Sequence, residues 1–150
     1  MAPDVPLKLR AEDPEDLAVI SAVLQDALVA VADFTYDRAA RRFTLVANRF
    51  RWEAKPDGAD GETGFERTLC ALSFGEVEHV AYRGFRRRDD DRILSLLAIR
   101  LGEAGGIVHL DFSGGAGLRL KAGALRVHAS DVGEPWPTAW RPDHEVDDRR

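Results

Sequence analysis

Apolar residues recur at helical spacing in only one part of this sequence, close to the N-terminus. The positions on this predicted helix face are Leu17, Ile20, Leu24 and Leu28. Asp13 suits the N-cap, and Pro14, which lacks an amide hydrogen, suits the first helical position. The pattern predicts one helix over about residues 14–27, preceded by a short strand in which Leu7 and Leu9 alternate with basic residues.

Elsewhere apolar and polar residues alternate with the period of two that is typical of strands with one buried face. Turn-forming residues such as glycine and aspartate separate these segments. The segments are residues 29–34, 42–52, 68–74, 77–85, 108–112, 118–121 and 125–129. Within 42–52 the apolar positions change parity between Leu45 and Phe50, which predicts a β-bulge near Asn48.

The segment ILSLLAIRL, residues 93–101, fits two structures. Its apolar residues can share one face of a helix capped by Asp91, or they can fill a central strand that is apolar on both sides. Because hairpin-like segments flank it on both sides, we interpret it as a strand.

This succession predicts a single domain, residues 1–150, of the α+β class and mainly β. A chain of about seven or eight strands leaves open edges unless the sheet curls. We therefore expect an antiparallel meander curled into a small barrel or a bent sheet, with the helix covering one end. Residues 54–64 are rich in glycine and acids and are predicted to form a flexible loop.

Composition narrows the classes of function. The 150 residues carry a formal net charge of −5, which disfavours general affinity for nucleic acid or for an anionic membrane. Cys70 is the single cysteine, so the chain can form neither an intramolecular disulfide nor a cysteine-based zinc site. The N-terminus shows no apolar signal core, and no apolar run is long enough to cross a membrane. We expect a cytoplasmic protein that uses no cofactor.

Two charged stretches offer only weak sites. Residues 84–92 place three consecutive arginines before three consecutive aspartates, a pattern typical of a solvated hairpin tip rather than of a metal site. Between Arg38 and Trp52, arginines lie among aromatic residues, a composition that can bind single-stranded nucleic acid. Because Phe50 and Trp52 are predicted core residues, we do not expect nucleic acid as a partner.

Polar residues on the wet face of the later strands are the candidates for a catalytic site. His109 and Asp111 lie two positions apart and share one face of a strand, and His128 lies on the polar face of a nearby strand, beside Arg126. An imidazole near a carboxylate can act as an acid–base pair. The competing interpretation is the ordinary solvent-facing side of a sheet, because no third catalytic group is evident.

The segment GEPWPTAWRPDHE, residues 133–145, contains two of the three tryptophans. Its prolines exclude a normal helix and favour an extended course, in which Trp136 and Trp140 point the same way. Two indoles are costly to leave in water, so we expect this segment to pack on the domain, with a partner surface as the alternative. Trp136, Trp140 and Arg126 are the candidate binding residues, and residues 146–150 are expected to fray.

Three segments carry a resemblance: LKLRAEDPEDLAVISAVLQDALV near the N-terminus, ILSLLAIRL in the middle and GEPWPTAWRPDHE near the C-terminus. Together they resemble a family of small proteobacterial proteins known only as a domain of unknown function. The resemblance implies a bacterial protein and brings no catalytic residue, cofactor or substrate. More loosely, the later strands are similar to pleckstrin-homology-like barrels, although in this sequence the helix precedes the strands.

Two functions compete at this stage. The first is a non-enzymatic binding or scaffold domain with an unknown protein partner or a second copy of itself, favoured because no catalytic constellation is visible. The second is a small enzyme, or a ligand-binding barrel, that uses the polar face around His109, Asp111 and His128. A deep pocket lined by these groups would favour the second.

Overall fold

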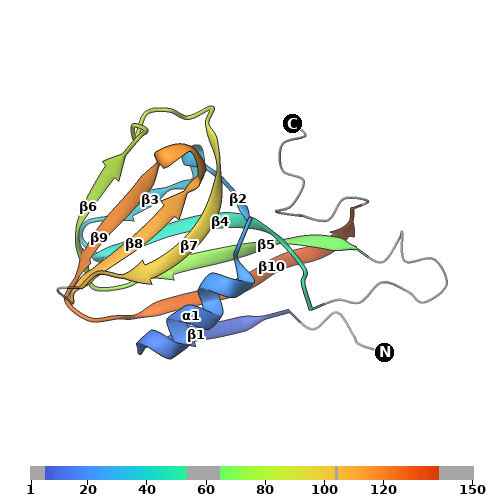
Figure 1. The fold of residues 1–150 in the computed structure, drawn as a ribbon, viewed down its shortest axis with the longest axis horizontal. Helices are drawn as coiled ribbons and strands as arrows, with labels where there is room; N and C mark the ends of the chain where they lie inside the picture. Colours follow the sequence, from blue (N-terminus) through green and yellow to red (C-terminus); the bar gives the residue numbers. More distant parts are fainter. Residues whose placement is uncertain (1–5, 54–64, 104, 139–150) are drawn as a thin grey trace.

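The computed structural model describes residues 6–53, 65–103 and 105–138. In these residues one α-helix packs against a strongly bent antiparallel sheet of ten strands (Figure 1). Two short 3-10 helices, η1 (Val31–Asp33) and η2 (Ser113–Gly115), lie between strands. The elements are β1 (Lys8–Ala11), α1 (Pro14–Val23), β2 (Leu28–Ala30), β3 (Thr35–Asp37), β4 (Arg42–Phe50), β5 (Glu66–Phe74), β6 (Val77–Arg83), β7 (Ile93–Leu101), β8 (Ile107–Phe112), β9 (Gly117–Ala122) and β10 (Val127–Pro137). The predicted α+β, mainly β architecture is confirmed, and residues 93–101 form a strand. No helix in the described residues is long and apolar enough to span a membrane.

The helix begins where the sequence predicts but ends earlier. The side chain of Asp13 caps it by accepting a 2.8 Å hydrogen bond from the Asp16 amide. The predicted end near residue 27 is wrong, because α1 stops at Val23. Asp26 adopts a left-handed conformation with φ 68°, and its amide donates to the Leu96 carbonyl at 2.7 Å. This contact with β7 turns the chain directly into β2.

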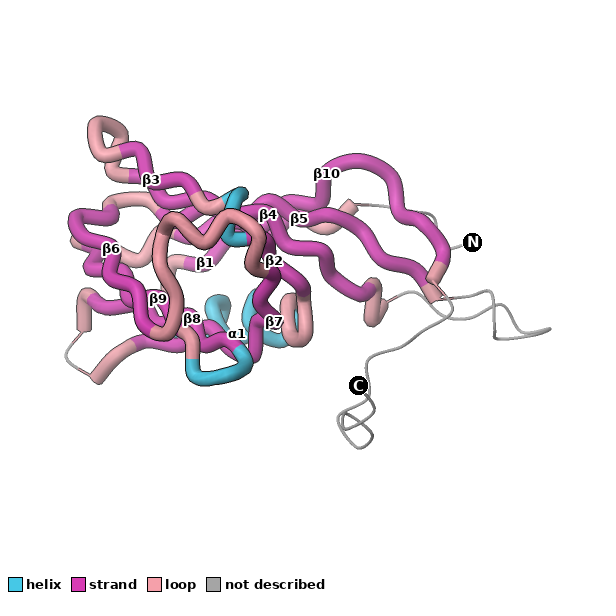
Figure 2. Tube along the Cα trace, turned by 90° about the horizontal axis from the view of Figure 1, so that it is seen from above, coloured by secondary structure: helices cyan, strands magenta, loops and turns pink. Residues whose placement is uncertain are grey.

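The sheet runs in the order β1-β10-β5-β4-β2-β7-β8-β9-β6, and β3 pairs with β4 beside this path. Figure 2 shows β4, β2, β7, β8, β9 and β6 curving around a shared interior, with β3 near β6. Among the described strands, β3 and β6 share no backbone pairing. Of the two predicted forms, the sheet is therefore the bent one, and a seam remains open between β3 and β6.

The interior is apolar along most of β4 and β5. Three inward residues of β4, Phe43, Leu45 and Ala47, lie opposite Phe74, Leu72 and Cys70 of β5. The register continues without a shift as far as Phe50, so the predicted bulge near Asn48 is wrong. The change of parity has another cause. Arg49 takes the next inward position, whereas Phe50 is buried on the opposite face, where its ring packs edge-on against Trp52.

β10, the last strand, lies between β1 and β5. Its register against β5 shifts between Val132 and Trp136, and Gly133 in this stretch has a positive φ of 76°. After the shift, Trp136 lies opposite Arg67. The first part of the Trp/Pro segment is thus the end of a strand. The remainder of that segment and of the terminus, residues 139–150, and the predicted flexible loop 54–64 lie outside the described residues.

Candidate anion-binding slot

The structure places His109 and Asp111 on the outer face of β8. His109 lies between Arg100 of β7 and Arg119 of β9, its cross-strand neighbours. Partial burial, and after it the charge of Arg100, lower the pKa of His109 below its ordinary value. Asp111 is hydrogen bonded to Arg100, whose Nε donates at 2.6 Å, rather than to His109. This geometry neutralises a carboxylate with an arginine and does not form a histidine–aspartate pair.

The other candidate residues lie elsewhere on the surface. His128 is exposed on β10, opposite Arg10 and Ser73, and four strands of the sheet separate β10 from β8. Arg126 precedes β10 and faces Glu76, with 3.7 Å between Nε and the carboxylate. Trp136 is 38% exposed on β10, and Trp140 lies outside the described residues. The structure thus does not bring His128 together with His109 and Asp111.

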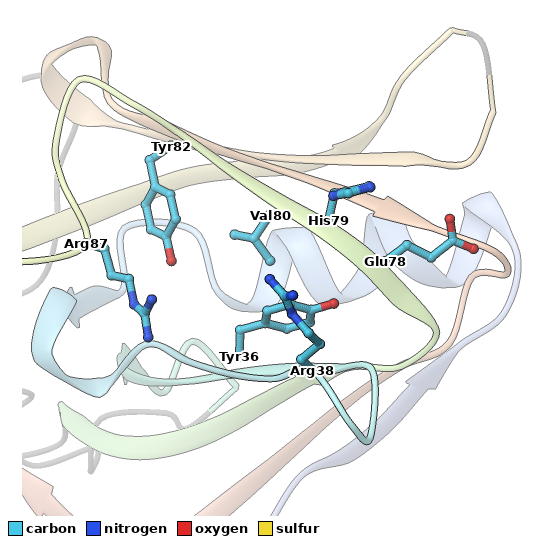
Figure 3. Close-up of a pocket in the computed structure, with 7 residues that line it drawn as sticks. All are labelled: Tyr36, Arg38, Glu78, His79, Val80, Tyr82 and Arg87. Atoms are coloured by element: carbon cyan, nitrogen blue, oxygen red, sulfur yellow. The ribbon is translucent and has the colours of Figure 1, made fainter.

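A slot opens at the seam between β3 and β6 (Figure 3). Its volume is about 300 Å³, at the lower end of the range for small-molecule sites. It is lined by Tyr36, Arg38, Glu78, His79, Val80, Tyr82 and Arg87. In Figure 3, Tyr82 and Arg87 lie toward one end of the slot and Glu78 and His79 toward the other.

The floor of the slot is aromatic and apolar. Val80 and Tyr82 point inward from β6, and Tyr36 packs on the same core from β3. The Tyr36 hydroxyl donates a 2.7 Å hydrogen bond to the carbonyl of Val77 and so links the two edges of the seam. Burial raises the pKa of Tyr82, against the opposing effect of Arg87. Its hydroxyl therefore stays protonated at neutral pH and can donate a hydrogen bond.

Two arginines bring positive charge to the rim of the slot. Arg38 lies in the turn between β3 and β4, and Arg87 lies in the connection between β6 and β7. In the part of the chain that the structure describes, neither arginine forms an ion pair. Glu78, the one carboxylate in the lining, is bound by Arg41 at 3.2 Å. The slot therefore combines two uncompensated cations with a flat aromatic floor, which suits an anionic ligand.

Short turns hold both arginines in place. The Ala40 amide donates to the Asp37 side chain at 3.1 Å, and the Arg86 amide donates to the Asp89 side chain at 2.9 Å. Asp89 of the charged run 84–92 thus shapes a loop. Within the described ranges, no three side chains of the histidine, cysteine, aspartate or glutamate types are grouped to hold a metal ion.

The sequence did not predict this slot. The Tyr36-Asp37-Arg38 turn and the alternation along 77–85 are visible as separate local patterns. Nothing in either pattern indicates that the sheet bends until β3 and β6 face each other. The signal that was available is the position of arginines just outside two strands that also carry inward tyrosines.

A second polar cluster is buried and already satisfied. The side chain of Arg49 is fully buried and faces two carboxylates at once. Its Nε and Nη2 donate to Asp131 at 2.9 and 2.8 Å, and its Nη1 and Nη2 donate to Glu53 at 3.0 and 2.8 Å. The Leu7 amide donates to Asp131 as well, at 2.9 Å. This cluster ties β4 to β10 and to the start of β1, and we assign it a structural role.

Cys70 lies beside this cluster on the inner face of β5. It is 2% exposed, as expected for a small core residue. Burial, and the nearby charge of Asp131, raise the pKa of its thiol to about 12. The thiol is therefore neutral under physiological conditions and is not poised as a nucleophile.

The chain matches a model of a known protein family. A family model described as a protein of unknown function, DUF2948, matches residues 7–144. Neither a curated protein nor a solved structure matches the chain. The match covers every described element from β1 to β10, which includes both sides of the slot.

Proposed function

Because the chain belongs to the DUF2948 family, whose description names no activity, we propose its function from the geometry of the slot. The protein is a non-enzymatic binding domain, and the slot between β3 and β6 takes a small ligand that joins an anionic group to a flat apolar part. The observation that carries the proposal is the placement of Arg38 and Arg87, without ionic partners in the described residues, beside the rings of Tyr36 and Tyr82.

Each part of the slot corresponds to a part of this ligand. Guanidinium groups bind phosphate or carboxylate through paired hydrogen bonds, which gives Arg38 and Arg87 the anionic end. The tyrosine rings and Val80 favour a planar apolar group, and the protonated Tyr82 hydroxyl supplies a further donor. The slot residues form no nucleophile–base pair in the described structure, so binding is favoured over catalysis.

Phenyl phosphate is a suitable probe because it contains both chemical features in one small molecule. We expect titration with phenyl phosphate to shift the backbone NMR resonances of Tyr36, Val80 and Tyr82. Inorganic phosphate and phenol, which each lack one feature, should bind more weakly. The double variant Arg38→Gln/Arg87→Gln should weaken the phenyl phosphate affinity by about tenfold or more, since the loss of even one charge-assisted bond costs about 1.5–3 kcal/mol.

A matched control separates the slot from net charge. The variant Lys8→Gln/Arg10→Gln removes the same two charges from exposed positions of β1, at the opposite end of the sheet order from β6. It should bind phenyl phosphate as the unmodified protein does. Equal weakening in both double variants, or resonance shifts that avoid the slot at millimolar probe, would contradict the proposal.

We further propose that this binding domain works in the bacterial cytoplasm. The three segments that resemble proteobacterial proteins support the bacterial assignment. The single cysteine, buried and protonated, suits a reducing compartment, in which proteins do not depend on disulfides. Fractionation of cells that produce the chain at low level would test this assignment by showing which fraction retains it.

A further inference from the structure

The outer face of β8, β9 and β6 is strongly basic although the whole chain carries a net charge of −5. Side chains on this face alternate with the inward core residues of each strand. With the adjacent end of β7, the face presents Arg83, Arg100, Arg119, Lys121, His79 and His109. We call this set the basic face. The acidic residues nearby in the described strands are Asp111 and Glu78, and Arg41 binds Glu78.

Histidines on the basic face lie opposite arginine or lysine residues of the neighbouring strands. In one row across the sheet, His109 has Arg100 on one side and Arg119 on the other. Protonation of His109 would place three like charges in this row, and like charges at such positions repel. The lowered pKa of His109 records the same repulsion, after the effect of burial. Within this row Arg100 is paired with Asp111, whereas Arg119 is exposed and available to another molecule.

Asp111 shows how this face holds a carboxylate. Arg100 donates to it at 2.6 and 3.3 Å, and Arg83 approaches it from the other side at 3.9 Å. Gly117 makes room for Arg83, because a Cβ at this position would meet Arg83 Nη2 at 2.7 Å. One carboxylate is thus bound by two arginines that converge from different strands.

The neighbouring cations have no such carboxylate. Arg119 and Lys121 are exposed on β9, and in the described part of the protein neither forms an ion pair. With His79 and Ala81 of β6 they line a shallow hollow of about 210 Å³. As around Asp111, two cations lie close together, but no carboxylate of the described residues lies between them, so a carboxylate of another molecule can bind there.

We propose that the basic face docks an acidic, extended peptide segment of a partner protein, with Arg119 and Lys121 at the centre. Side chains two residues apart on a strand are about 7 Å apart, so Arg119 and Lys121 match carboxylates on alternate residues of an extended peptide. The inference does not rest on the ligand proposed for the slot, and the two sites share only His79.

An acidic peptide fits this face better than nucleic acid does. The larger aromatic residues of β6 and β8, Tyr82 and Phe112, both point inward, so the stacking rings on the described outer face are the small imidazoles of His79 and His109. A long polyanion would also meet the net negative charge of the rest of the molecule, whereas a short peptide would contact only the basic face.

Fluorescence anisotropy with labelled probes tests the proposal on the full chain. The probe is a peptide of alternating glutamate and serine, compared with the same peptide carrying glutamine for glutamate and with an oligothymidylate. We expect the glutamate peptide to bind at low salt, and the other two to bind much more weakly. The double variant Arg119→Gln/Lys121→Gln should weaken binding of the glutamate peptide by about tenfold or more.

Two double variants introduced above, each lacking two positive charges, serve as controls. Lys8→Gln/Arg10→Gln and the slot variant Arg38→Gln/Arg87→Gln should both keep the peptide affinity, and thermal unfolding should show that all three variants remain folded. Three results would overturn the proposal: no binding of the glutamate peptide, tighter binding of the oligothymidylate, or equal losses in all three variants. A protein that binds the glutamate peptide but not phenyl phosphate would contradict the proposed slot ligand and still support the proposal for the basic face.

Discussion

At the scale of single residues, Arg49 is the most unusual feature of the interior. A buried arginine is tolerated only when its donors are satisfied, and here two carboxylates supply the acceptors. Burial alone would raise the pKa of Asp131, but the hydrogen bonds from Arg49 and the Leu7 amide, together with the charge of Arg49, outweigh burial and lower it. Glu53 responds in the same way. The cluster is therefore ionised and mutually dependent at neutral pH.

Removing one partner should leave a buried charge only partly paired. We expect Asp131→Asn to lower the free energy of unfolding by about 3 kcal/mol, near the lower end for a broken buried pair because Glu53 remains. The double variant Arg49→Met/Asp131→Leu removes both charges, so its free energy of unfolding should lie closer to that of the unmodified protein. Urea denaturation measures both values. If Asp131→Asn were as stable as the double variant, the ionic account would be wrong.

Cys70 gives a second prediction at this scale. A pKa near 12 leaves about a thousandfold less thiolate at neutral pH than an ordinary cysteine has, and burial blocks the reagent as well. A disulfide reagent that releases a coloured thiol should label Cys70 at the rate of global opening. Fast labelling of the folded protein would show that β5 opens locally.

At the scale of elements, the sequence predicted most of what local pattern controls. Asp13 and Pro14 marked the start of α1, and alternation located the long strands. The end of α1 was predicted wrongly because it depends on a contact with Leu96, far along the chain. The bulge near Asn48 was wrong because an inward arginine broke the apolar parity while the strand continued. Both errors come from tertiary contacts that override local pattern.

The end of β10 is the element whose contribution is easiest to measure. Trp136 is 38% exposed, lies opposite Arg67 and is followed by Thr138, whose amide donates to Phe65 at 2.8 Å. We expect a chain ending after Gly133 to be less stable than one ending after Thr138 by about 1–2 kcal/mol, the contribution of a partly buried large apolar side chain. Thermal unfolding of the two chains, with the full chain beside them, tests this. Equal midpoints for the two shortened chains would contradict it.

At the scale of the whole molecule, the slot could not be predicted because it belongs to no single segment. Its two sides come from β3 and β6, which lie far apart in the sequence and meet only through the bend of the sheet. Charge shows the same effect. The net charge of the chain is −5, whereas the fold gathers Arg83, Arg100, Arg119 and Lys121 on one outer face. Charge distribution, which governs binding, depends on the fold rather than on composition.

The carboxylates that face Arg49 should make the stability of the whole molecule depend on pH in the acid range. Asp131 and Glu53 have folded-state pKa values below their ordinary ones, so their stabilisation is present above the unfolded-state pKa and is lost as pH falls through the folded values. We expect the urea midpoint to fall steeply below about pH 4. The gap between the unmodified protein and Asp131→Asn should be constant above about pH 5 and narrow below it. If the difference in urea midpoint widened as pH falls, the pKa of Asp131 would be raised in the folded protein rather than lowered.

The position of β10 between β1 and β5 also sets an order of events during synthesis. The strand β1 leaves the ribosome early, but among the described strands its one partner is β10, which is made last of them. At about 5–20 residues per second, β1 and the amide of Leu7 wait on the order of ten seconds for β10 and Asp131. During that interval β5 also exposes the edge that β10 will occupy. In a nascent chain, the backbone of β1 and the edge of β5 therefore stay unpaired until β10 has been made.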